Sequence, residues 1–302
     1  MRFFTTCLLF AFAAANAYKV VGANNSLEAV QGAKSAAVGG AALALDSDLP
    51  SLVHNPLQLS NIVKSSIAFT HVAYFEGTSY NGVVMALPLI GAGTLGFAAS
   101  RFGAGDIPYI KENDPLPEGE SYNTLSISDW LLTSAWGRSF GKLNLALSMH
   151  LLKRELDQSG WGFRSDIAAG YEFSKRFVLA GIVKGWAASS VRWESGHFEY
   201  SNPEFYAAFK FSEPFPYFYG KLNAYWQSAG VSEDWLSASS AGLEFETDFS
   251  FSLRAGLAEV NNTNGLALGA GIKPTSWLSA DYAFQMHQVL SSVHRISVTA
   301  SF

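Results

Sequence analysis

The chain has 302 residues, a formal net charge of −5, 15% charged residues and a single cysteine, Cys7. The small negative charge, with no basic block, leaves no electrostatic footprint for nucleic acid. One cysteine can form neither an internal disulfide nor a cysteine metal site. The charged fraction is low against the roughly 25% usual for soluble domains, so the many apolar residues must fill a large core or face lipid.

Residues 1–17 have the form of a signal peptide. A short basic start at Arg2 precedes an apolar run over residues 3–14, and Ala15-Asn16-Ala17 gives a small-x-small cleavage site. Cleavage after Ala17 would also remove Cys7. The alternative, an uncleaved anchor helix, is less favoured because the run is short for a membrane span.

Residues 18–64 do not alternate and predict a small plug. The stretch is rich in Ala, Gly and Leu, and we expect short helices near residues 35–45 and 56–62. Pro56 suits the first position of the second helix. Such a segment is too small for a core of its own, so we expect it to pack inside a larger body, the lumen of a barrel.

From residue 65 onward, apolar residues alternate with small or polar ones. In the last segment Ile296, Val298, Ala300 and Phe302 share one face, while Arg295, Ser297, Thr299 and Ser301 share the other. The segments are longer than ordinary strands and reach the length that crosses a bilayer. About fourteen of them follow one another, which predicts an all-β fold: a transmembrane antiparallel β-barrel of about 14 strands over residues 65–302.

The connections alternate between short and long, as in bacterial outer-membrane barrels with short periplasmic turns and longer outer loops. Short turns are expected near residues 89–93, 138–142, 174–176, 213–216, 246–248 and 273–276. Longer loops are expected near residues 103–125, 154–162, 192–202 and 228–237. This order predicts an outer-membrane location and outer-membrane lipid as a partner.

Several charged residues fall on predicted lumen-facing positions. They are Asp166, Glu172, Lys210, Glu244, Arg254, Asp281 and Arg295. A mutually paired polar lumen is the simpler interpretation, and an interior that tunes selectivity is the sharper one. The outward residues Ile296, Val298, Ala300 and Phe302 form a candidate C-terminal assembly signal for the barrel-assembly machinery.

Two motifs suggest enzyme chemistry, but neither has the required context. Gly91-Ala-Gly93-Thr-Leu-Gly96 resembles a dinucleotide fingerprint, yet the alternation that follows predicts a strand instead of the helix the fingerprint needs. Gly137-Arg-Ser-Phe-Gly141 resembles a nucleophile elbow, which also needs a following helix. The six histidines lack ligand spacing. We therefore expect no enzyme, no catalytic residue, no metal and no cofactor.

The plug and the last hairpin resemble a known family. Gly32-Ala33, Ala36, Gly39-Gly40-Ala41, Asp46, Asp48 and Asn55-Pro56-Leu57-Gln58-Leu59 are similar to the start of PorV/PorQ outer-membrane proteins. That group lies within the FadL transporter superfamily. Asp281-Tyr-Ala-Phe284 and His294-Arg-Ile-Ser297 are similar to its closing hairpin. Leu57 departs from the group's usual N-P-A, which leaves the packing of that turn open.

The resemblance implies a fourteen-stranded barrel whose plug contains Gly39, Gly40, Asp46, Asp48, Asn55 and Pro56. Resemblance to PorV-like members implies a role in type IX secretion, with a cargo C-terminal signal and attachment-complex proteins as partners. FadL-like members imply passive transport of hydrophobic molecules. Secretion is the first expectation and transport the alternative. A secreted, soluble carbohydrate-binding module is a remote third.

Overall fold

The structure is a computed structural model of the chain, and it describes residues 32–75, 77–109, 123–155, 158–229, 239–259, 262–287 and 291–302. The predicted signal peptide, residues 1–17, and the first part of the predicted plug, residues 18–31, lie outside the described residues. The predicted outer loop near residues 228–237 also lies largely outside them.

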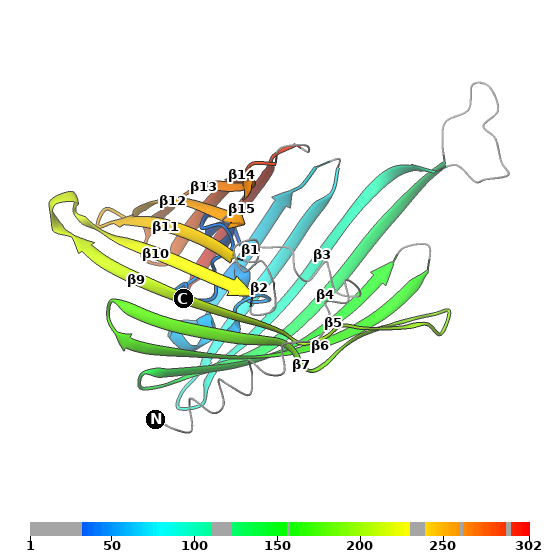
Figure 1. The fold of residues 1–302 in the computed structure, drawn as a ribbon, viewed down its shortest axis with the longest axis horizontal. Coiled ribbons are helices and arrows are strands. Elements are labelled where there is room, and N and C mark those ends of the chain that lie inside the picture. Colours follow the sequence, from blue (N-terminus) through cyan, green and yellow to red (C-terminus); the bar gives the residue numbers. More distant parts are fainter. Residues whose placement is uncertain are drawn as a thin grey trace.

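Fourteen of the fifteen strands close into an antiparallel barrel (Figure 1). The wall consists of β1 (Ser66–Ala73), β2 (Ser79–Leu89), β3 (Gly93–Tyr109), β4 (Asn123–Phe140), β5 (Leu143–Glu155), β6 (Ser159–Ser174), β7 (Phe177–Trp193), β9 (Glu204–Phe215), β10 (Gly220–Ala229), β11 (Ser239–Thr247), β12 (Phe251–Glu259), β13 (Asn262–Thr275), β14 (Leu278–Gln285) and β15 (Val293–Ser301). Pairing of β1 with β15 closes the circle. The short β8 (Phe198–Tyr200) pairs only with β7 among the described strands. The predicted fold class is confirmed.

The predicted alternation places apolar side chains on the outer wall. Phe69, Phe97, Leu132, Met149 and Ile296 come from five strands, and each is between 45% and 57% exposed. Their neighbours on the other face are buried. A closed barrel satisfies every backbone hydrogen bond between its strands, which is the condition for β-structure to cross lipid. The apolar outer wall therefore has the form of a membrane-facing belt.

Tight turns gather at one end of the barrel, which we call the turn end. Ser66 at the start of β1 and Phe302 after β15 lie there too, since the amide of Phe302 donates to the carbonyl of Ser65. The 3₁₀ helix η3 (Pro216–Phe218) makes the β9–β10 turn. The opposite end, with the other connections, we call the loop end.

Two predicted outer loops are shorter than expected. β3 ends only at Tyr109, and β4 already begins at Asn123. Much of the loop expected over residues 103–125 is therefore strand. β5 ends at Glu155 and β6 begins at Ser159, so most of residues 154–162 is strand as well. Polar residues continue the ladder there because the strands rise beyond the apolar belt. In Figure 1 the long strands β3 and β4 project well past their neighbours.

The segment after residue 32 lies inside the barrel and contains α3 (Ala33–Ala37), η1 (Leu49–Ser51) and η2 (Pro56–Asn61). α3 contacts β12 to β15, η1 contacts β1, β2 and β15, and η2 contacts β3 to β6. We call residues 32–65 the plug; in Figure 1 it is the blue segment enclosed by the strands. No helix of the described residues is long and apolar enough to cross a membrane.

The predicted helices of the plug were only partly right. The helix expected over residues 35–45 is the five-residue α3, which stops before Gly39 and Gly40 because both adopt positive φ. The helix expected over residues 56–62 is the 3₁₀ helix η2, with Pro56 at its first position. The 3₁₀ helix η1 was not predicted from the sequence.

Candidate functional site: the plug and the inner wall

The turn after α3 seats on a flat, glycine-lined part of the inner wall. Gly39 and Gly40 have φ of +70° and +82°, a region that favours glycine. Gly242 and Gly256 pair across β11 and β12 opposite this turn. A Cβ on Gly242 would lie 2.5 Å from Cβ of Val38, and one on Gly256 would collide with the backbone nitrogen of Gly39. These glycines let the two backbones touch.

Asp48 joins α3 to η1 inside the plug. Its carboxylate accepts hydrogen bonds from the backbone amide of Ser35 at 3.0 Å and from the hydroxyl of Ser51 at 2.6 Å, and also from the Ser35 hydroxyl. The side chain is buried. Burial raises the pKa of this carboxyl above its ordinary value, against the opposing effect of the two hydroxyl donors.

Asn55 joins two turns of the plug. Its side-chain oxygen accepts from the amide of Leu57 at 3.1 Å and caps η2. Its side-chain nitrogen donates to the carbonyls of Ala42 at 2.8 Å and Leu43 at 3.1 Å. Pro56 follows as the first residue of η2. Asn55 therefore holds residues 42–43 of the plug against the start of η2.

A cation of the plug is buried against the barrel wall. Lys34 of α3 lies 3.2 Å from Glu244 and 3.6 Å from Glu246 on β11. Glu244 also accepts from Arg254 at 2.7 Å and from the hydroxyl of Tyr225 at 2.6 Å. Burial alone would lower the pKa of Lys34, but the nearby carboxylates, led by Glu244, raise it above its ordinary value.

This network brings together three of the predicted lumen residues, because Arg254 also bonds Asp281 at 2.7 Å. Sequence reasoning missed Lys34, its partner in the plug. The signal that could have found it is the position of a lone cation within the small-residue stretch around it. Such a cation needs a buried carboxylate once the stretch is placed in a lumen.

A second ion pair holds the other side of the plug. Asp46 pairs with Lys210 of β9. The Lys210 side chain is nearly buried, whereas that of Asp46 is half exposed. The two acidic residues of the plug motif thus differ in role: Asp46 contacts the wall, and Asp48 holds the plug together.

Asp166 forms a separate cluster in the wall. Its carboxylate lies 3.1 Å from Nε2 of His150 and 3.0 Å from the guanidinium of Arg164, and all three side chains are buried. It also accepts from the amide of Gly185 at 2.9 Å, where the β6–β7 register shifts. The cluster therefore fixes an irregularity in the wall.

The last two predicted lumen residues lie apart from these clusters. Glu172 accepts a hydrogen bond from the side-chain nitrogen of Asn144 at 3.2 Å. Arg295 donates to Gln285 at 3.0 Å, and its guanidinium lies 5.4 Å from the ring centroid of Tyr74. The seven residues are distributed around the wall and do not form one site.

Near the loop end, one part of the inner wall, on β1 to β3 and β15, is apolar. Val72, Tyr80 and Val293 form a buried cluster with Tyr74, Phe75 and Phe102 packed against it. The rings of Tyr74 and Phe102 lie edge to face, with centroids 5.6 Å apart. This part of the inner wall is therefore aromatic and aliphatic.

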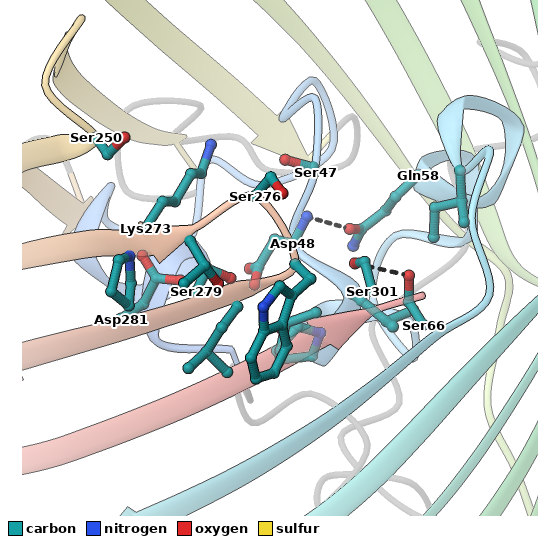
Figure 2. Close-up of a pocket in the computed structure, with 18 residues that line it drawn as sticks. Ser47, Asp48, Gln58, Ser66, Ser250, Lys273, Ser276, Ser279, Asp281 and Ser301 are labelled. Atoms are coloured by element: carbon teal, nitrogen blue, oxygen red, sulfur yellow. Dashed lines mark hydrogen bonds between the residues drawn. The ribbon is translucent and has the colours of Figure 1, made fainter.

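Toward the turn end the space beside the plug is polar. A cavity of about 560 Å³ lies between the plug and the β13–β14 hairpin. Figure 2 shows Asp48 and Gln58 of the plug facing Ser279 and Asp281 of β14 and Lys273 of β13 across it. Hydroxyl groups dominate its lining.

The C-terminal residues lie on the outer wall. Ile296 and Val298 are 51% and 38% exposed, Ala300 is on the same face, and Phe302 is 73% exposed. Their role as an assembly signal stays a prediction. Of the glycines of the rejected cofactor motif, Gly91 lies in the β2–β3 turn, Gly93 begins β3 and Gly96 lies within β3. Among the described residues, no group of three His, Cys, Asp or Glu could hold a metal ion.

Comparison with known proteins supports the fold. No protein-family model matches the sequence, and no curated protein matches it significantly. The toluene transporter TbuX of Ralstonia pickettii is similar in structure, with a TM-score of 0.59 at 12% identity over 91% of this chain and 100% of that one. The chain has the fold of the FadL-type outer-membrane transporters.

Two further structures agree with this assignment of the fold. The toluene transporter TodX of P. putida gives a TM-score of 0.53 at 12% identity, over 90% of this chain and 98% of that one. A FadL homologue of Pseudomonas aeruginosa gives 0.52 at 10% identity, over 90% and 98%. The likeness extends over nine-tenths of the chain in each case.

Proposed function

We propose that the chain is a passive outer-membrane channel for small hydrophobic molecules, with the plug controlling the lumen. One observation carries the proposal: a plugged fourteen-stranded barrel whose fold follows that of two toluene transporters over nine-tenths of the chain. The apolar inner wall around Tyr74 and Phe102 supports it, because small hydrophobic molecules bind in apolar, aromatic-lined sites.

Uptake by intact cells tests this function. Cells lacking the protein should take up toluene more slowly than cells that carry it, while uptake of a hydrophilic disaccharide should be the same in both. Equal toluene uptake would contradict the proposal. Equal losses for both solutes would indicate a general defect of the membrane.

A role in type IX secretion is a second candidate. It is favoured by the resemblance of residues 32–59 and of the closing hairpin to PorV/PorQ proteins. The similar structures reported above are transporters and a transporter homologue, which fits transport better. Secretion predicts that cargo proteins with a C-terminal signal disappear from the cell surface on deletion, with toluene uptake intact.

The remote expectation of a soluble carbohydrate-binding module has less support. The outer wall exposes large apolar side chains on strands around the barrel. Large exposed apolar patches mark contact with a membrane or a partner. Two observations separate a membrane barrel from a soluble module. A barrel should change its gel migration on heating in detergent, whereas a soluble module should stay in solution without detergent.

A further inference from the structure

One row of paired residues on the outer wall interrupts the apolar belt. Arg101 of β3 pairs with Trp130 of β4, which pairs with Lys153 of β5, which pairs with Trp161 of β6. All four side chains lie on the outward face of the alternation, and Trp130 and Trp161 are 49% and 53% exposed. Cations and tryptophans therefore alternate across four neighbouring strands.

This row marks the edge of the apolar belt on the loop side. One step toward the turn end, the next outward residues on the same strands are Ala99, Leu132, Leu151 and Phe163, which are all apolar. Tryptophan suits such an edge because its ring is apolar and its N–H is polar. Arginine and lysine also suit it, since their stems cover apolar surface while the charge stays in the polar layer.

A groove lies directly below the row. It has a volume of about 470 Å³ and spans β2 to β6 on the outward side, where large residues flank the small Ala99 and Ser134. Met85, Phe97, Leu132 and Met149 form its apolar sides. The groove is separate from the lumen, because these side chains belong to the outer wall.

The two cations stand at the outer rim of the groove. The guanidinium of Arg101 lies 5.8 Å from the ring centroid of Trp130, and Nζ of Lys153 lies 6.0 Å from that of Trp161. Both cations thus rest beside aromatic rings with polar atoms exposed. Glu155 lies 2.5 Å from Lys153 and balances part of the charge.

We propose that the groove and its rim bind a phosphate-bearing glycolipid of the outer leaflet. An acyl chain occupies the groove, and a phosphate group lies between Arg101 and Lys153, which match its negative charge. The site lies on the loop side, and tight turns of bacterial outer-membrane barrels face the periplasm. The assignment to the outer leaflet therefore rests on the outer-membrane location in the proposed function, with the turn end facing the periplasm.

Direct binding to the detergent-solubilised full chain tests this site, with diphosphorylated lipid A as the probe and native mass spectrometry as the readout. Attraction of about fivefold per cation predicts that Arg101→Gln with Lys153→Gln lowers lipid A retention by about 25-fold. Arg138→Gln with Lys142→Gln is the matched control. It also removes two cations, at the turn end, where Arg138 stands over the ring of Phe140. Equal retention in both variants, or equal loss, would overturn the proposal.

A second variant tests the groove without changing charge. Ala99→Phe should fill the groove and lower lipid A retention severalfold, while heat-modifiable migration confirms that the barrel is folded. Unchanged lipid A retention in this variant would overturn the proposal. Toluene uptake on deletion is measured separately. A negative result for the lipid site therefore does not contradict the transport function, and a negative uptake result is recognised by its own assay.

Discussion

Nζ of Lys34 lies 3.2 Å from Oε1 of Glu244, and their side chains are 6% and 0% exposed. The pair joins the plug to β11 and continues through Arg254 to Asp281. Charges buried this deeply are stable only when paired. The contact is therefore the principal polar attachment of the plug that the structure describes on this side of the barrel.

Replacing Lys34 should loosen the plug. Lys34→Met leaves Glu244 with Arg254 as its remaining cation, so we expect a loss of about 3 kcal/mol, the lower end of the range for breaking a buried pair. Urea unfolding in detergent measures the loss, and limited proteolysis of the plug shows its release. Lys64→Met, at an exposed position of the same segment, should change neither.

A methyl group on the glycine-lined wall should displace the plug. Gly256→Ala places a Cβ against the backbone of Val38 and Gly39, and overpacking of this kind costs about 1–3 kcal/mol. Gly170→Ala is the matched control, because its Cβ would meet Leu57 at an ordinary 3.6 Å. If both variants unfold at the wild-type denaturant midpoint, the close contact does not position the plug.

The stability of the plug should depend on the protonation of Asp48. Burial raises its pKa in the folded protein, so the folded state binds the proton more tightly than the unfolded chain. This contribution is present in full below the unfolded pKa of about 3.9 and is lost as pH rises through the raised value.

Asp48→Asn removes that titration and isolates its effect. The free energy of unfolding of the variant minus that of wild type should be larger at pH 7 than at pH 4. This difference should shrink steadily as pH falls. The free energy of unfolding, measured for both proteins at each pH, gives the difference. A difference that is constant with pH would contradict the burial argument.

Phe302 should matter more for assembly than for the stability of the finished barrel. Its ring is 73% exposed, so Phe302→Ser should change the free energy of unfolding by no more than about 0.5 kcal/mol. If the C-terminus is an assembly signal, the amount of protein in the outer membrane should fall severalfold. Phe249→Ser, at an equally exposed turn position, should leave that amount unchanged.

The sequence predicted most of the wall because the strand period is two and lipid requires one apolar face. The apolar Ile296 next to the polar Arg295, or Leu132 next to Thr133, already indicates which face is the outer one and which the inner one. Loop lengths near residues 154–162 were wrong, since polar residues can continue a ladder above the membrane as readily as they can form a loop. The five-residue length of α3 was also missed, because its end depends on positive φ at Gly39 and Gly40.

By itself, the sequence determined a closed barrel with an apolar outer face and a plug too small to fold alone. Alternation and segment length are local properties, so they can be read along the chain. Only the tertiary structure decided which charges meet. Lys34 and Glu244 are far apart in sequence, and so are Asp46 and Lys210. Their proximity depends on strand register and on how the plug seats on the glycines of the wall.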